Sequence, residues 1–398
     1  MNLLKEIKAV ASGNNIPVYL VGGIVRDKLL GKKTDNPDIT VEGDGITFAK
    51  LLQKKLGGKL IVHPDFGTAT LIFKTGKLDI ATCREEKYSA PAKLPIVKNS
   101  TLLKDLKRRD FTINTMALDL QTNKLIDPFN GQQDLKLKLI RILHDKSFED
   151  DPTRIFRAFR FAGRLGFKPE KETAELIREA ISGGFIQKLT PERIKNEIVL
   201  ILKEPKRYEI IKFMNEFKPI LLKHIGLKMP DKKLFDAITA NLKLPCFNKE
   251  IKNDWFVYFC ALIDYKKLPT LIKLTKEELS ILKQIDLLLS GISKLKKAKL
   301  PSEIYKQLHS MQEESLLFVI SAVPSVKSKI LKFLTVYNKV RINITGKELA
   351  KLGIKSGPLY AELLSSILYG KLDGKIRTKA DEIRFLKSRK LPQLKGKN

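Results

Sequence analysis

The chain has 398 residues and carries 75 lysines and arginines against 44 aspartates and glutamates, a formal net charge of +31. It is too long for one ordinary core, so we expect roughly two to four domains of about 100 to 150 residues each. So large a positive surplus repels itself unless a polyanion is a usual partner, and nucleic acid fits best. Lysine-rich, solvated helix faces are the alternative explanation of the charge.

Cysteines, histidines and apolar runs exclude several classes of protein. None of the three cysteines, Cys83, Cys246 and Cys260, belongs to a CxxC pair, so neither a disulfide frame nor a zinc knuckle is indicated. The four histidines lack metal-ligand spacing. No apolar run approaches the roughly 18 to 20 residues of a membrane span, and the first residues lack the apolar region of a signal peptide. We therefore expect a cytoplasmic protein with no membrane partner.

Short β-rich runs mix with helical segments over about the first 140 residues. MNLLKEIKAVAS predicts a helix, PVYLVGG a strand that enters a glycine turn, and IVRDKLLG the helix that leaves it. Further strand signals are DITVEG, KLIVH, TATLIF, KLDIATC and KLIDPF. Several of these strands end at charged residues, where we expect a site to be built.

Segments of helical period, rich in Leu, Ile and Lys, follow from about residue 150. Pro152 is expected just inside the start of the first helix, and Thr190 and Pro191 are expected to cap and begin another. In the first helix, Phe159 and Phe161 are expected to pack one side, while arginines recur every three or four residues. The pattern predicts an α+β head followed by an all-α remainder.

Two features of the head point to phosphate and metal chemistry. The Gly22-Gly23 turn offers bare backbone N–H groups and a helix start where a phosphate can dock, and Arg26 adds charge. Asp38 and Asp79 are expected on neighbouring strands, and carboxylate oxygens suit Mg²⁺. The plainer alternatives are a tight turn with a local ion pair, and aspartates that serve as caps or ion-pair partners.

Arginines and aspartates also occur together in RRDFTINTMAL at 108–118 and DDPTRIFRAFRF at 150–161, both with apolar residues at helix spacing. An arginine fork and a carboxylate on a rigid helix can read the Watson–Crick edge of a base, because they offer fixed donors and acceptors. The alternative is an Arg–Asp lattice that ties the head to the helical part. For Arg157 and Arg160 both interpretations stay open.

These segments, in order, resemble the class II tRNA nucleotidyltransferase and bacterial poly(A) polymerase family. The resemblance runs through LVGGIVRDKLLG, DITVEGDG, LDIATCREEKY, RRDFTINTMAL, LIDPFNGQQDL, IRILHDKSFEDDPTRIFRAFRFAGRLGF and TPERIKNEI, between residues 20 and 198. It implies a polymerase β-type nucleotidyltransferase head with a mixed sheet at 1–142, a helical neck for nucleobase selection at 143–205, and a helical body and tail for tRNA binding at 206–398.

The resemblance also implies two groups of site residues in the head, position by position. Gly22, Gly23 and Arg26 would hold the triphosphate. Asp38 and Asp79 would be the catalytic, metal-binding carboxylates, with Mg²⁺ as the cofactor.

A further group is implied to face the incoming nucleotide. Arg109, Asp151 and Arg154 would select cytosine or adenine. Arg157 and Arg160 would line the nucleotide pocket.

One position departs from the family pattern. Members carry Asp-x-Asp after the glycine turn, and gapless counting places Asn36 and Asp38 there. Asparagine lacks the charge that a ligand bridging two Mg²⁺ ions supplies. We expect Asp35 to substitute in part as a catalytic, metal-binding residue; the alternatives are the loss of two residues or a weakened activity.

The expected reaction is untemplated attack of a tRNA 3′-hydroxyl on the α-phosphate of CTP or ATP, with release of pyrophosphate. A poly(A) polymerase and a specialist that adds only CC or only A are rivals within the same class, since the head motifs are shared. A catalytically weakened RNA-binding homologue is the rival from another class, and Asn36 favours it. The oligomeric state is left open.

Overall fold

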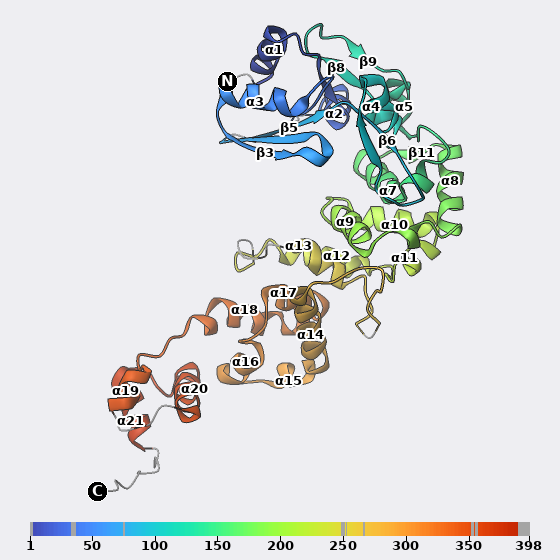
Figure 1. Cartoon of the computed structure of the whole chain (residues 1–398). Helices are drawn as coiled ribbons and strands as arrows, with labels where there is room; N and C mark the ends of the chain where they lie inside the picture. Colours follow the sequence, from blue (N-terminus) through green and yellow to red (C-terminus); the bar gives the residue numbers. More distant parts are fainter. Residues whose placement is uncertain are drawn as a thin grey trace. The chain divides into compact units, whose positions relative to one another are not determined.

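The computed structural model describes residues 3–32, 37–74, 76–247, 251, 253–265, 267–351, 354 and 357–388. The chain divides into two compact units, one of Met1–Leu227 with Pro269–Lys273, and the other of Lys228–Leu268 with Leu274–Asn398. In Figure 1 the first unit is mainly blue to green and the second yellow to red. The functional division into head, neck, and body with tail remains a prediction.

A seven-stranded mixed sheet forms the core of the first unit. Its order is β3-β4-β5-β2-β1-β8-β9, in which β2 and β5 pair in parallel and the other described neighbours pair antiparallel. The strands are β1 (Val18–Val21), β2 (Asp38–Val41), β3 (Lys59–His63), β4 (Thr68–Phe73), β5 (Gly76–Thr82), β8 (Ala117–Asp119) and β9 (Leu125–Ile126). The predicted α+β head with a mixed sheet is therefore confirmed.

Apolar and polar side chains alternate along the strands, so the core and the candidate site lie on opposite faces of the sheet. Leu78 and Ile80 of β5 are buried, whereas Asp79 between them is partly exposed. Successive side chains of a strand point to opposite faces, so the apolar residues pack inward and the aspartate lies on the opposite face. Helix α3 (Gly45–Leu56) lies against β3, β4 and β5, and α1 (Leu3–Gly13) packs against α3.

Shorter elements complete the sheet-bearing part of the first unit. They are α2 (Gly23–Leu29), η1 (Pro64–Phe66), β6 (Arg84–Lys87), β7 (Ile96–Asn99), α4 (Leu102–Lys107), η2 (Thr112–Asn114), α5 (Gly131–Leu137), β10 (Leu139–Ile140) and α6 (Ser147–Asp150). β6 and β7 form a separate antiparallel pair, and β10 pairs in parallel with β11 (Lys168–Pro169).

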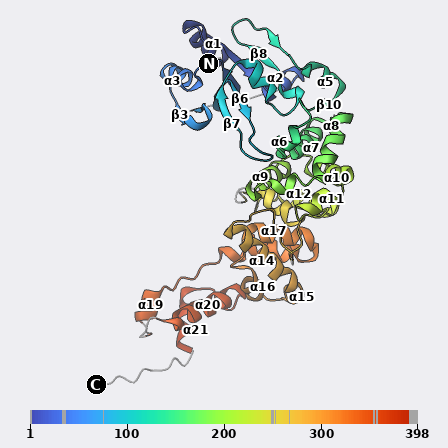
Figure 2. The same cartoon turned by 45° about the vertical axis from the view of Figure 1, so that its right-hand side comes forward.

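Helices follow in the rest of the first unit. They are α7 (Thr153–Leu165), α8 (Lys171–Ser182), η3 (Ile186–Lys188), α9 (Pro191–Leu202), α10 (Arg207–Phe217) and α11 (Ile220–His224). α7 packs against both α9 and α10, and Figure 2 shows the three close together. Thr190 caps α9 and Pro191 is its first residue, as predicted, whereas Pro152 stands just before α7 rather than inside it.

The second unit is helical throughout its described residues. Its elements are α12 (Lys232–Asn241), α13 (Asp254–Cys260), α14 (Lys276–Ser290), α15 (Ile292–Lys297), α16 (Pro301–Leu308), α17 (Glu313–Ala322), η4 (Pro324–Val326), α18 (Lys327–Thr335), η5 (Tyr337–Lys339), α19 (Gly346–Lys351), α20 (Pro358–Leu372) and α21 (Lys379–Ser388). α17 is buried on most of its surface and contacts α12, α13 and α14, so it is the central helix of this core. Among the described helices, none is long and apolar enough to span a membrane.

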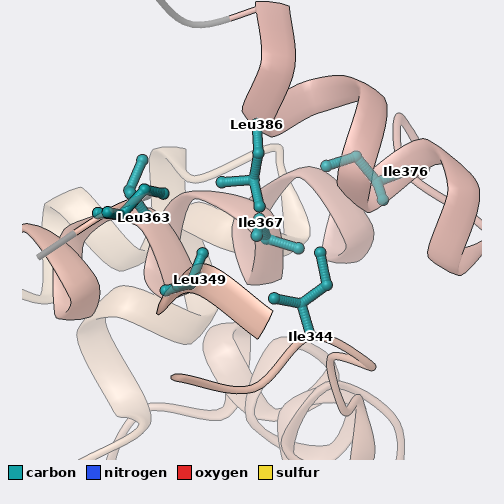
Figure 3. Close-up of a cluster of buried hydrophobic side chains, with 7 residues drawn as sticks. Ile344, Leu349, Leu363, Ile367, Ile376 and Leu386 are labelled. Atoms are coloured by element: carbon teal, nitrogen blue, oxygen red, sulfur yellow. The ribbon is translucent and has the colours of Figure 1, made fainter. Parts of the chain in front are cut away.

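Helices α19, α20 and α21 have a small core of their own, drawn in Figure 3. Its buried side chains are Ile344, Leu349, Ile354, Leu363, Ile367, Ile376 and Leu386. The buried carboxylate of Glu382 accepts hydrogen bonds from the backbone N–H groups of Asn343 and Ile344 and from Lys371 Nζ. Glu382 thereby satisfies backbone N–H groups just before α19 and links α21 to α20.

Candidate active site

A cavity of about 510 Å³ in the first unit collects most of the predicted site residues. Those that line it are Gly22, Gly23, Arg26, Asp38, Arg109, Asp151, Arg154, Arg157 and Arg160. They lie in the turn between β1 and α2, in α2, at the first residue of β2, in the segment after α4, between α6 and α7, and in α7. Asp79 is next to Asp38 in the sheet without lining the cavity, and Asp35 and Asn36 lie outside the described residues.

The glycine turn that lines the cavity depends on the absence of a side chain. Gly22 has φ 68°, a left-handed conformation that favours glycine. A Cβ on Gly22 would also stand 2.7 Å from Arg109 Nη1. Buried Arg26 donates from Nη1 to Asn114 Oδ1 at 2.7 Å and from Nε to Asp27 Oδ1 at 2.8 Å. Arg26 therefore makes the expected local ion pair and still lines the cavity.

Asp38 and Asp79 are direct neighbours across the parallel strands β2 and β5. Asp79 accepts hydrogen bonds from Thr70 Oγ1 at 2.7 Å and Lys77 Nζ at 2.6 Å. Desolvation by surrounding protein atoms raises the pKa of Asp38, and the nearby charge of Asp79 raises it further. Burial opposes ionisation of Asp79, but the bonds from Lys77 and Thr70 outweigh it and lower its pKa.

This carboxylate pair has the donor chemistry that a hard divalent cation requires. Charge repulsion between Asp38 and Asp79 favours a cation beside them, and Lys77 already provides one positive charge. Within the part of the chain that the structure describes, no group of three or more His, Cys, Asp or Glu side chains is arranged to hold a metal ion. Asp38 and Asp79 supply two oxygen donors of the type that Mg²⁺ takes, while the predicted third ligand, Asp35, falls at a position the structure does not describe.

The prediction of a helix through RRDFTINTMAL is wrong. α4 ends at Lys107, and after it the described backbone forms only the short 3₁₀ turn η2 before β8. Asp110 Oδ1 accepts from its neighbouring N–H at Phe111 (2.9 Å) and from Asn114 Nδ2 (2.9 Å), which stabilises a turn instead. Ile113 and Met116 have no exposed surface, because the segment is surrounded by other elements and not because it presents one helical face.

Asp151 and Arg154 are held firmly where α6 meets α7. Asp151 Oδ1 accepts from Thr153 Oγ1 and from Arg193 Nη2, both at 2.6 Å. Buried Arg154 donates to Ser147 Oγ at 2.6 Å and to the carbonyl of Arg108 at 2.9 Å. Fixed donors and acceptors of this kind can discriminate between bases, because an unmatched partner costs free energy.

The arginines of α7 make the ion-pair lattice that the sequence left as an alternative. Arg157 donates to Asp110 Oδ2 from Nε at 2.9 Å and from Nη2 at 2.5 Å, so α7 is tied to the segment after α4. Burial opposes the ionisation of Asp110, but the charge of Arg157 outweighs it and lowers the Asp110 pKa. Glu204 pairs with Arg164 at 2.6 Å and with Arg160 at 3.7 Å. The arginines of α7 thus form the ion-pair lattice and line the cavity at the same time.

Several lining residues were not singled out from the sequence. They are Glu86, Tyr88, Arg108, Asp110, Asn114, Thr153, Phe161 and Arg164. Arg108 and Asp110 were visible inside RRDFT, but nothing in the spacing around Asn114 or Phe161 distinguishes a cavity residue from a core residue. Buried Asp105 was also missed, and its two oxygens hold Arg108 and Arg109 at 2.7 and 2.8 Å.

Two parts of the chain match known domain families, and the whole chain has curated relatives. Residues 18–141 match the poly A polymerase head domain, and residues 166–225 match a domain described as the probable RNA and SrmB-binding site of polymerase A. An A-adding tRNA nucleotidyltransferase of Geobacter sulfurreducens is 38% identical over 96% of this chain and 46% of its own length. One from Halalkalibacterium halodurans is 30% identical over 97% of this chain and 91% of its own.

Solved structures agree as well. A CCA-adding enzyme in an apo form superposes with a TM-score of 0.78 at 33% identity, over 97% of this chain and 94% of that one. Similar CCA-adding enzymes were solved with ATP, with CTP and, for the Thermotoga maritima enzyme, with tRNA. The chain spans about half the length of some of its relatives, 46% for the Geobacter enzyme. This chain belongs to the class II tRNA nucleotidyltransferase and poly(A) polymerase family.

Proposed function

We propose that this chain is a template-independent tRNA nucleotidyltransferase that adds adenosine to the 3′ end of tRNA. The observation that carries the choice of adenosine is the extent of the alignments. The relatives that align over 96% and 97% of this chain are A-adding, whereas the CC-adding and multifunctional CCA relatives align over 49% and 47% of it.

The reaction joins the tRNA 3′-oxygen to the α-phosphorus of ATP and breaks the bond to pyrophosphate. Asp38 and Asp79 would hold Mg²⁺, which supplies charge to activate the hydroxyl and steady the leaving group when bound. The Gly22-Gly23 turn and Arg26, which line the same cavity as Asp38, bind the triphosphate. Placing both reactants correctly and stabilising charge account for most of the rate.

Asp151 and Arg154 face the base in this arrangement. Their hydrogen bonds to Thr153, Arg193 and Ser147 keep them from adapting to a different base edge. A rigid selector of this kind rejects the wrong nucleotide by leaving buried polar groups unpaired. The second unit, with its lysine-rich helices, would bind the tRNA by its phosphates, in keeping with the net charge of +31.

Addition of the whole CCA end is the second candidate. It is favoured by the solved CCA-adding enzyme that superposes over 97% of this chain. The carboxylate pair and the glycine turn serve either reaction equally, so they do not separate the two.

The deciding experiment incubates purified protein and Mg²⁺ with labelled ATP or labelled CTP. Three tRNAs are tested separately: one that lacks the whole CCA end, one that ends in C and one that ends in CC. The proposal expects AMP on the CC-ending tRNA and no CMP on any. CMP incorporation would establish CCA or CC addition, and repeated AMP beyond position 76 would establish poly(A) synthesis. Retained tRNA binding with no incorporation would identify a weakened homologue.

A further inference from the structure

The ring of Phe161 is surrounded by three guanidinium groups. The Cζ atoms of Arg160, Arg26 and Arg157 lie 5.0, 5.2 and 5.7 Å from its centroid. Arg26 belongs to α2 and the other two to α7, so the ring is a contact shared by two elements distant in sequence. Phe161 is 6% exposed, and Phe111 packs against it edge-on at 5.9 Å.

The three arginines are unequally neutralised by acids. Arg157 has a close pair in Asp110 and Arg26 has one in Asp27. Arg160 makes a longer ion pair with Glu204 at 3.7 Å and is also influenced by the charge of Glu197, and its buried Nε has no hydrogen-bond partner among the described residues. Burial lowers the pKa of Arg160, Glu197 opposes that shift, and the neighbouring charges of Arg157 and Arg164 add to it. The cluster therefore holds cations close together with incomplete compensation.

An aromatic ring suits such a cluster better than a carboxylate would. The negative face of the ring attracts a guanidinium without accepting its hydrogen bonds or cancelling its charge. A carboxylate at the same place would pair with the arginines and leave less positive charge for an incoming anion. All three arginines and Phe161 line the same cavity as the Gly22-Gly23 turn.

We propose that Phe161 is a positioning residue, whose ring holds Arg26, Arg157 and Arg160 as a preformed receptor for the triphosphate of the incoming nucleotide. This inference rests on the proposed function for the identity of the anion. It assigns to Phe161 a role through the arginines and no contact with the reacting atoms.

The test compares Phe161→Leu, which keeps an apolar side chain and removes the ring, with Phe161→Tyr, which keeps the ring. Phe161→Met, a flexible apolar replacement, serves if the leucine variant does not fold. Calorimetric titration of the full chain with inorganic tripolyphosphate at fixed ionic strength gives the affinity. We expect roughly a tenfold loss for the leucine or methionine variant and less than about twofold for tyrosine.

A purely structural role predicts something else. Thermal unfolding of Phe161→Leu would shift, but the folded fraction would bind tripolyphosphate as tightly as the wild type, and that result would overturn the inference. In calorimetric titrations with ATP and with CTP we expect both affinities to fall by the same factor, with their ratio unchanged. Because tripolyphosphate binding needs no tRNA, a ring-dependent affinity in a protein without transferase activity would refute the proposed function and leave this inference standing.

Discussion

Buried carboxylates hold three of the arginines that line the cavity in fixed positions. Asp105 has no exposed surface and receives Arg108 on one oxygen and Arg109 on the other. Asp110 accepts two hydrogen bonds from Arg157 on one of its oxygens. A long, flexible arginine loses much conformational entropy when it binds a ligand unless it is already held. These pairs therefore convert flexible side chains into fixed donors before any ligand binds.

Replacement of Asp38 by asparagine tests the carboxylate pair. We expect the single-turnover rate of AMP transfer to fall on the order of a thousandfold, because about 4 kcal/mol of charge stabilisation is lost. The affinity for ATP, measured by calorimetry without tRNA, should change little. Asp65→Asn, an exposed aspartate in η1, is the matched control. A rate within tenfold of the wild type would contradict the assigned role.

Replacement of Asp151 by alanine tests base selection. The ratio of the affinity for ATP to that for CTP, measured by calorimetry, should fall by roughly ten- to a hundredfold, since a site that hydrogen-bonds a base edge loses its discrimination. Affinity for tRNA should be nearly unchanged. Asp145→Ala, which removes an exposed acid nearby, is the control. Equal losses for both nucleotides, with the ratio intact, would remove Asp151 from this role.

Individual elements are stabilised by local devices that can be tested separately. Asp44 caps α3, and its carboxylate accepts from the N–H groups of Ile46 and Thr47 and from Thr47 Oγ1. Gly163 lets α7 approach α10, where a Cβ would stand 2.2 Å from Ile210 Cγ1. The first device depends on charge and the second on shape, so they respond to different conditions.

The cap of α3 should contribute a pH-dependent stability. Asp44→Ala is expected to cost about 1 kcal/mol at pH 7. The hydroxyl of Thr47, followed by its backbone N–H, holds the pKa of Asp44 below its ordinary value. A lowered folded pKa means that the contribution is present above the unfolded value of about 3.9 and is lost as pH falls through the folded value.

Urea unfolding of the wild type and Asp44→Ala at pH 7 and near pH 3 measures this difference. The gap between them should narrow at the acid pH. Asp44→Asn keeps an acceptor that does not titrate, so the stability of the Asn variant relative to the Ala variant should stay nearly constant. An Asp-to-Ala gap as large at pH 3 as at pH 7 would exclude the ionised cap.

The contact of α7 with α10 should not tolerate a methyl group. Gly163→Ala is expected to destabilise the protein by roughly 1 to 3 kcal/mol, because Ile210 must move or change rotamer. Gly13→Ala, where a Cβ meets nothing within 4 Å, should be neutral or slightly stabilising. In an Ile210→Ala background, which removes both Cγ1 and Cδ1, the added cost of Gly163→Ala should be smaller. Denaturant unfolding checks all three, and a neutral Gly163→Ala would mean that the helices can separate freely.

At the scale of the whole molecule, the dominant property is the charge of +31. We expect tRNA affinity to fall steeply with salt, since neutralising six or more phosphates costs about a thousandfold between roughly 50 and 200 mM. Lys294, Lys297 and Lys306 line a second cavity, of about 490 Å³, in the second unit. If one of these lysines contacts a phosphate, its replacement by alanine should make the plot of log association constant against log salt concentration less steep by roughly 0.7 to 0.9.

Filter binding across a salt series measures that slope. Lys232→Ala is the control, because Lys232 is already paired with Asp236 at 2.9 Å on an exposed face of α12. A slope near zero for the wild type would show that the charge serves solubility alone. An unchanged slope in all three lysine variants would place the phosphate contacts elsewhere.

Most of the head could be anticipated because its signals are local. Strand alternation predicted β3 and β5, the glycine pair predicted the turn after β1, and Thr190 with Pro191 predicted the start of α9. The segment from Arg108 to Leu118 was predicted incorrectly, because its apolar spacing fits a helix equally well when the residues are buried on every side. Only contacts with other elements distinguish the two cases.

By itself the sequence determined the α+β head, the largely helical remainder, the family and the residue types available to the site, since periodicity, turn chemistry and motif order are properties of neighbouring residues. The short strand β11, inside the part predicted to be all-α, was not predicted, because it depends on pairing with β10. The tertiary structure alone decided that Arg26 binds Asn114, 88 residues away, that Asp105 holds two arginines, and that Phe161 joins three. Such pairings depend on which groups, distant in sequence, are removed from water together. An unpaired buried charge costs free energy, so these pairs form, but only when the whole chain has packed.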